Sequence, residues 1–226
     1  MKMKTLLTVV CVAASLCAAS PAAAQAYKLE KAAAPPPAAL STAVRETLST
    51  EVLRVTGPKG LLCELWVRKS LPAAAAPSDE PDVKLARLAE GTLAGAMRLA
   101  SDASDFRRQT IRAGVYTLRY AWIPVDGDHL GRAAQRDFLL LSPAAADTNP
   151  AGITRDELLE LSRKSTTTKH PSVWSLALLE AGAGTLPAVV RNEDDNTWLL
   201  GFPATLAGGG SPVRMGLVVV GSAPEI

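Results

Sequence analysis

Apolar and polar residues alternate along most of the chain after residue 50. The clearest case is the segment 113–125, in which Tyr116, Leu118, Tyr120 and Trp122 share one side of an extended backbone. Successive side chains of a strand point to opposite faces, so this alternation is typical of a half-buried β-strand. Comparable segments bring the number of predicted strands to eight or nine: 51–56, 61–69, 91–100, 136–142, 172–180, 186–191, 197–202 and 213–221.

Two short segments have a helical pattern instead. Leu40, Val44 and Leu48 recur at four-residue spacing, which predicts one turn or two of amphipathic helix. At 154–165, Thr154 and Glu157 fit a capping box in front of a leucine-rich run. With no regular alternation of strands and long helices, we expect an all-β fold. The pattern favours an antiparallel two-sheet sandwich with two short helices, with a β-barrel as the alternative.

The segments between these elements have the composition of turns and loops. Gly57 to Gly60 predicts a tight turn, and the acidic residues 192–196 predict a hairpin tip. Residues 70–82, rich in alanine and proline, form the one obvious inserted loop. The glycines within 91–100 suggest a strand that another backbone approaches closely.

The first residues have the layout of a secretory signal peptide. Lys2 and Lys4 precede an apolar run and a small-residue cleavage site, which predicts a signal peptide over 1–24 with cleavage after Ala24 or Ala26. The apolar run is shorter than a membrane-spanning helix requires. We therefore expect a periplasmic or secreted protein without stable membrane insertion, with an Ala/Pro-rich lead-in over 25–37 and a single β-sandwich domain over 38–226.

Removal of this leader changes what charge and cysteine content imply. The chain has 24 Lys+Arg and 22 Asp+Glu, and the leader holds two of the lysines and no acid, so the remainder has 22 of each. A balanced charge gives no reason to expect nucleic acid as a partner. Of the three cysteines, only Cys63 lies outside the leader, and its position among alternating apolar residues predicts a buried side chain.

Candidate chemistry is concentrated in the segment 123–143. It contains Asp126, Asp128, His129, Arg136 and Asp137 around a predicted strand–loop–strand, and we predict a ligand-binding edge formed by these residues and His170. Two imidazoles and carboxylates would suit a divalent metal, so Asp126, Asp128, His129 and His170 are the candidate ligands of a metal-dependent hydrolase. In the structural alternative, Asp-Gly forms a turn, and Arg136 and Asp137 hold the loop ends.

The aromatic side of segment 113–125 offers a third possibility. An exposed row of Tyr116, Tyr120 and Trp122 would suit a carbohydrate-binding module. Only 4% of the residues are aromatic, however, so we expect these three in the core.

Signature motifs of common hydrolases, redox proteins and phosphate-binding loops do not occur after the leader. The run "IRAGVYTLRY", the loop "PVDGDH" and "RDF" together resemble a group of secreted bacterial proteins without assigned function, over about residues 90–145. That resemblance implies a β-sandwich and export, and no catalytic residues. We predict a non-enzymatic binding or envelope-interaction module of unknown envelope or extracellular ligand and no cofactor, with the metal-dependent hydrolase and the carbohydrate-binding module as alternatives.

Overall fold

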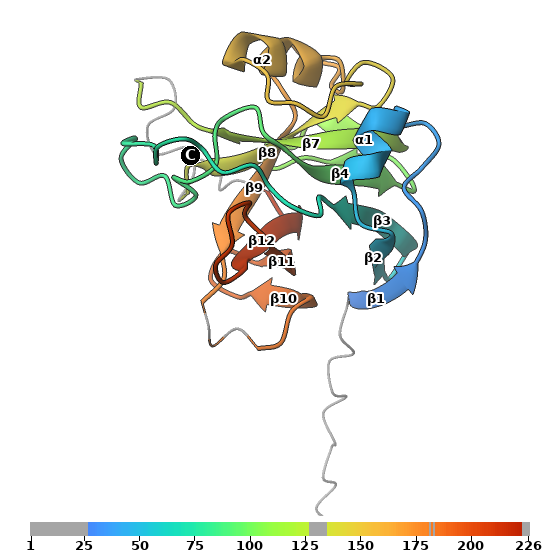
Figure 1. Cartoon of the computed structure of the whole chain (residues 1–226). Helices are drawn as coiled ribbons and strands as arrows, with labels where there is room; N and C mark the ends of the chain where they lie inside the picture. Colours follow the sequence, from blue (N-terminus) through green and yellow to red (C-terminus); the bar gives the residue numbers. More distant parts are fainter. Residues whose placement is uncertain (1–26, 127–134, 181, 183, 223–226) are drawn as a thin grey trace, which may run out of the picture.

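The computed structural model describes residues 27–126, 135–180, 182 and 184–222, and it is built almost entirely from antiparallel strands (Figure 1). Ten strands form one sheet in the order β1-β2-β3-β4-β7-β8-β9-β12-β11-β10. Their bounds are β1 Lys28–Ala33, β2 Glu51–Gly57, β3 Gly60–Val67, β4 Leu93–Leu99, β7 Gly114–Trp122, β8 Asp137–Pro143, β9 Val173–Leu178, β10 Ala188–Asn192, β11 Thr197–Ala204 and β12 Val213–Val220. Strands β5 (Ala103–Ser104) and β6 (Thr110–Ile111) form a separate short pair.

Strand β9 is the corner at which the sheet folds back on itself. Its first half pairs with β8, with Leu139 opposite Trp174, and its second half pairs with β12, with Leu217 opposite Leu176. The strands on either side of β9 therefore face each other as the two layers of a sandwich. The remaining edges, β1 and β10, come close to each other, so the sheet is nearly closed. The predicted all-β, antiparallel architecture with two short helices is confirmed.

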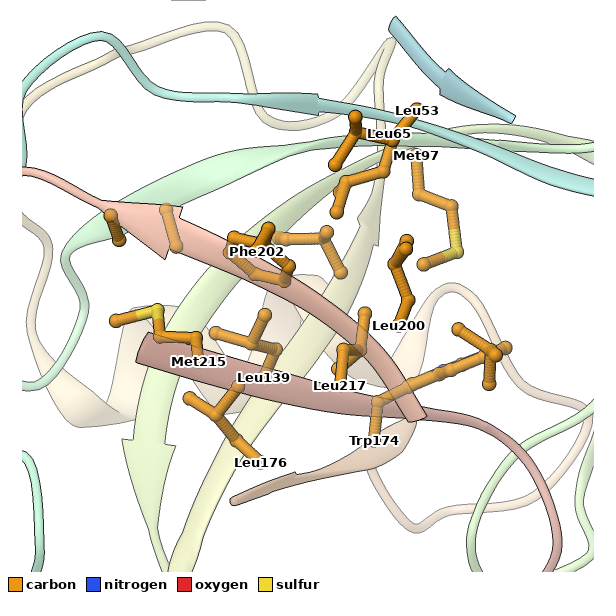
Figure 2. Close-up of a cluster of buried hydrophobic side chains, with 14 of the residues drawn as sticks. Leu53, Leu65, Met97, Leu139, Trp174, Leu176, Leu200, Phe202, Met215 and Leu217 are labelled. Carbon is orange, nitrogen blue, oxygen red and sulfur yellow. The ribbon is translucent and has the colours of Figure 1, made fainter. Parts of the chain in front are cut away.

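The main core lies between the two halves of the sheet (Figure 2). Leu53, Leu65 and Met97 from the β1–β8 half meet Leu200 and Leu217 from the other half. All five are almost fully removed from water, which is the main favourable contribution to folding. In β7, Tyr116, Leu118 and Tyr120 of the predicted face belong to this core, and Trp122 packs against it.

Cys63 belongs to this core, as predicted. Its thiol is buried in an apolar environment, and burial, with a smaller effect from the charge of Glu64, raises its pKa to about 12. The thiol is therefore uncharged at neutral pH, and Cys63 contributes as a small apolar side chain.

The two helices cover the outer faces of the sheet. Helix α1 (Thr42–Thr47) packs Val44 against Trp66 of β3 within a second apolar cluster. Helix α2 (Arg155–Arg163) packs Leu158 against Phe138 of β8. The predicted capping box is present, with the Thr154 hydroxyl accepting from the Glu157 amide. None of the helices in the described part of the chain is long or apolar enough to span a membrane.

The close approach predicted at the glycines of 91–100 is found at Gly95 of β4. A Cβ atom at this position would lie 2.6 Å from the carbonyl oxygen of Trp66 in the neighbouring strand. No side chain fits there without movement of the β3 backbone.

The predicted lead-in over 25–37 is wrong for residues 28–33, which form β1. The side chains of this strand are exposed or half-exposed on both faces, so its sequence has no clear apolar side. It is extended because its backbone forms a continuous antiparallel ladder with β2, from Lys28 opposite Thr56 to Ala33 opposite Glu51. Such a ladder depends on a partner segment further along the chain, which local composition does not reveal.

Candidate functional site

Asp137 organises the end of the sheet at which β7 ends and β8 begins. Its carboxylate is buried and accepts hydrogen bonds from the backbone amides of Lys84 (2.8 Å) and Leu85 (3.0 Å). It also accepts a hydrogen bond from the Tyr120 hydroxyl at 2.6 Å. Burial, followed by this bond to Asp137, raises the pKa of Tyr120 far above its usual range, so Tyr120 remains a donor. One carboxylate thus joins β7, β8 and the loop that precedes β4.

Arg136 joins the same loop to the segment that follows β7. Its Nε donates to the carbonyl oxygen of Ile123 at 2.8 Å, and one Nη donates to the Glu80 carboxylate at 2.9 Å. The other Nη donates to the carbonyl oxygen of Pro81. The Arg136 side chain is 13% exposed; its bond to Ile123 is partly buried, whereas its bonds to Glu80 and Pro81 lie at the surface. The Arg136 guanidinium group therefore links residues 80–81 of the loop to Ile123.

A third tie connects this end of the sheet to α2. Arg155, at the start of α2, pairs with Glu90 and also donates to the carbonyl oxygen of Trp122 at 3.4 Å. Burial raises the pKa of Glu90, and the nearby Arg155 charge opposes this rise.

We name the surface formed by residues 78–85 and 123–126 the β7–β8 end. Arg136 and Asp137 hold these two segments in place.

The β7–β8 end carries an exposed apolar side chain. Val125 is 61% exposed, and in the described part of the chain Leu178, at 40%, is the other large apolar side chain that is strongly exposed. Asp126, the next residue, is exposed as well. Most other large apolar side chains are enclosed by the fold, so Val125 stands out as an exposed apolar side chain two residues after Ile123, which Arg136 binds.

Four of the predicted site residues can be placed, and they lie in two regions. Asp126, Arg136 and Asp137 belong to the β7–β8 end, whereas Asp128 and His129 lie outside the described residues. His170 precedes β9, and its carbonyl oxygen accepts from Thr166, next to Ser165, which donates to the carbonyl oxygen of Leu141 in the second half of β8. Asp137 is the first residue of β8, at the other end of that strand from Pro143.

His170 has local partners at its own end of the sheet. Its Nδ1 lies 2.8 Å from the carbonyl oxygen of Pro171, and its own carbonyl oxygen accepts from the Thr166 hydroxyl at 2.9 Å. The structure therefore does not bring His170 together with Arg136 and Asp137 as predicted. Within the described residues, no group of three or more His, Cys, Asp or Glu side chains is arranged to hold a metal ion. A role for Asp128 or His129 in metal binding stays a prediction.

The aromatic face that would bind a carbohydrate is part of the core. Tyr116 and Tyr120 are almost fully buried between the two halves of the sheet, and Trp122 is half-buried against the same cluster. The two tyrosines therefore lie in the core, as expected, and their buried rings are not available to stack on a carbohydrate.

The most enclosed charged pair was not predicted. Arg119, on the outer side of β7, has no exposed area, and it binds Asp147 through two hydrogen bonds of 2.7 and 2.8 Å. It also donates to the carbonyl oxygens of Gly91, Asn149 and Ala151. The signal in the sequence was an arginine in the middle of the most regular strand, where an unpaired charge is costly.

A shallow depression of about 370 Å³ lies beside this pair, lined by Ala146, Asp147, Thr148, Asn149, Ile153, Glu157, Glu160 and Leu161. Each of its carboxylates already has a protein partner. Asp147 binds Arg119, Glu157 accepts from Thr154, and Glu160 pairs with Arg163. These groups stabilise the loop and the start of α2.

Comparison with known proteins gives no relative: no family model, no curated protein and no solved structure matches the chain.

Proposed function

We propose that the protein is an exported, non-enzymatic binding module that contacts an envelope or extracellular partner through the β7–β8 end. The proposal rests on two observations. Val125 exposes an apolar side chain, and Arg136 and Asp137 fix the neighbouring residues Ile123 and Lys84 by hydrogen bonds. A surface that is already ordered loses less conformational entropy on binding, which favours affinity. The predicted signal peptide supports an extracytoplasmic location.

The state of the buried charges supports binding rather than catalysis. Catalytic groups need a reacting atom within reach, whereas the buried Asp137 and Asp147 carboxylates are occupied by backbone amides, a hydroxyl or a guanidinium group. Asp105 is occupied in the same way, by the amides of Gln109 and Val173. In the described residues these carboxylates hold loops to the sheet.

Site-specific photo-crosslinking in the producing cells tests this proposal. A photo-crosslinking amino acid replaces Val125, and the matched control replaces Lys59, which is equally a solvent-exposed position. Lys59 lies in the β2–β3 turn, and the register through β4 places that turn at the opposite end of β7. We expect one discrete adduct with an envelope or extracellular component from position 125 and none from position 59.

Equal labelling at both positions, or no adduct at either, would contradict the proposal. Elemental analysis of the purified full-length gene product serves as the control for metal chemistry. A stoichiometric metal that is lost in both His129→Ala and His170→Ala variants would favour the metal-dependent hydrolase instead.

A further inference from the structure

The ten-stranded sheet has one open seam, between its edge strands β1 and β10 (Figure 1). Every neighbouring pair in the sheet is antiparallel, so in a sheet of ten strands β1 and β10 run in opposite directions. They are also close in space. The two edges therefore have the relative direction of antiparallel neighbours, although no ladder joins them.

The side chain of Tyr27 bridges this seam. Tyr27 directly precedes β1, and its ring centroid lies 5.0 Å from that of Trp198 in β11, with the planes tilted by 57°. Trp198 pairs with Arg191 of β10, whose guanidinium carbon lies 6.0 Å from the Trp198 ring centroid. These are favourable distances for aromatic and cation–π contacts. Tyr27 thus reaches past the edge strand β10 to the second strand across the seam.

The chain provides a space for this ring at Gly57. A Cβ atom on Gly57 would lie 2.5 Å from Cε1 and 2.9 Å from Cδ1 of Tyr27. Gly57 ends β2, next to Thr56, which pairs with Lys28 of β1. Its backbone is not in the left-handed region, so another residue would be tolerated there if the ring were absent. The missing side chain therefore makes room for Tyr27.

We propose that Tyr27 is a latch that holds the seam closed and keeps β1 and β10 from pairing with strands of other chains. Unpaired edge strands present backbone donors and acceptors that another strand can recruit. Strand β10 contains Val189 and Val190, whose branched side chains favour extended pairing, so it is a competent partner for such pairing when it is free. The Tyr27 ring thus connects the β1 edge to β11 across the seam, where no backbone ladder joins β1 to β10.

Amide hydrogen exchange of variants made in the full-length sequence tests the latch. We expect Tyr27→Ala to accelerate exchange in residues 28–33 and 188–192 about tenfold, and Tyr27→Phe to leave it unchanged because the ring is retained. Phe106→Ala is the matched control, since Phe106 is also partly buried but pairs with Phe138 beneath α2. Unchanged exchange at the seam in Tyr27→Ala, or an equal acceleration in Phe106→Ala, would overturn the proposal.

A second substitution separates loss of the latch from general destabilisation. Gly57→Ala forces the Tyr27 ring out of its space, so it should accelerate exchange at the seam in the unchanged chain. In a Tyr27→Ala background the same substitution should have no further effect, because no ring remains to be displaced. Equal effects in both backgrounds would contradict the latch.

Sedimentation analysis tests the consequence for association. Tyr27→Ala should form larger species than the unchanged chain at the same concentration, and Tyr27→Phe should not. An unchanged mass for Tyr27→Ala at every concentration would overturn the protective role.

Discussion

At the scale of single residues, a few buried charges determine how loops are attached to the sheet. Asp137 is the clearest, because its carboxylate accepts two backbone amides from a loop more than fifty residues away in sequence. Arg119 and Asp147 do the same for the loop that follows β8. A buried polar group is tolerated only when its hydrogen bonds are satisfied. Loss of either the side chain or its partner therefore leaves the other group buried without a hydrogen bond.

Replacement of Asp137 by asparagine should lower the free energy of unfolding by about 2 kcal/mol. The carboxylate now accepts hydrogen bonds from three donors. The side-chain NH2 group of asparagine would face one of them, and that donor is left buried without a partner. Urea unfolding measures the change. Tyr120→Phe removes only one bond and should cost less, about 1 kcal/mol; a larger loss for Tyr120→Phe than for Asp137→Asn would be inconsistent with this arrangement.

Glu64 provides a prediction about pH. Burial by itself would raise the pKa of Glu64, but hydrogen bonds and charge from Arg98 and Arg54 outweigh burial, so its pKa lies below the usual value. An acid whose pKa is lowered by folding stabilises the fold above its unfolded-state pKa of about 4.3 and loses that contribution as the pH falls through the folded value.

Glu64→Gln should therefore be less stable than the unchanged chain at pH 7, by about 1 kcal/mol, and the difference should shrink below about pH 4. Unfolding curves measured between pH 3 and pH 7 test this. Glu51→Gln is the control, because Glu51 and its partner Lys31 are both about half exposed and such pairs contribute little. A difference that stays constant over the whole range would refute the role assigned to Glu64.

At the scale of elements, the alternating pattern was sufficient wherever one face of a strand is buried. It located β7 and its two faces, because Tyr116, Leu118 and Tyr120 enter the core while Thr117 and Arg119 point outward. It failed for β1, whose sides are both largely exposed and whose strand structure comes from pairing with β2. An alternating pattern arises only where one face of a strand is buried, and neither face of β1 is buried.

Gly95 gives a prediction at this scale. Gly95→Ala should destabilise the fold by about 1–3 kcal/mol, because the new methyl group meets the Trp66 carbonyl oxygen and forces β3 and β4 apart. Thermal or urea unfolding measures the loss. Gly152→Ala is the matched control, since nothing lies within 4 Å of its added Cβ, and its stability should be unchanged. Equal stability of the two variants would contradict the close approach of β3 and β4.

At the scale of the whole molecule, the candidate site was only partly accessible from sequence. Arg136 and Asp137 were identified as notable, and so was the alternative that they hold loop ends, but their partners Glu80, Lys84 and Leu85 are distant in sequence. His170 was grouped with them on the assumption that strand ends coincide. The loop that carries His170 is instead bonded to the second half of β8, through Ser165 and Leu141, and which loops adjoin depends on the complete sheet.

The central claim is that the β7–β8 end is a fixed surface that Asp137 holds to the sheet. Amide exchange at Lys84 and Leu85 tests it most directly, because both amides donate to that carboxylate. We predict slow exchange at both amides in the unchanged chain, and exchange at least about tenfold faster at one of them in Asp137→Asn, while the core strands keep their protection. Fast exchange at both amides in the unchanged chain, or no difference in the variant, would contradict the claim.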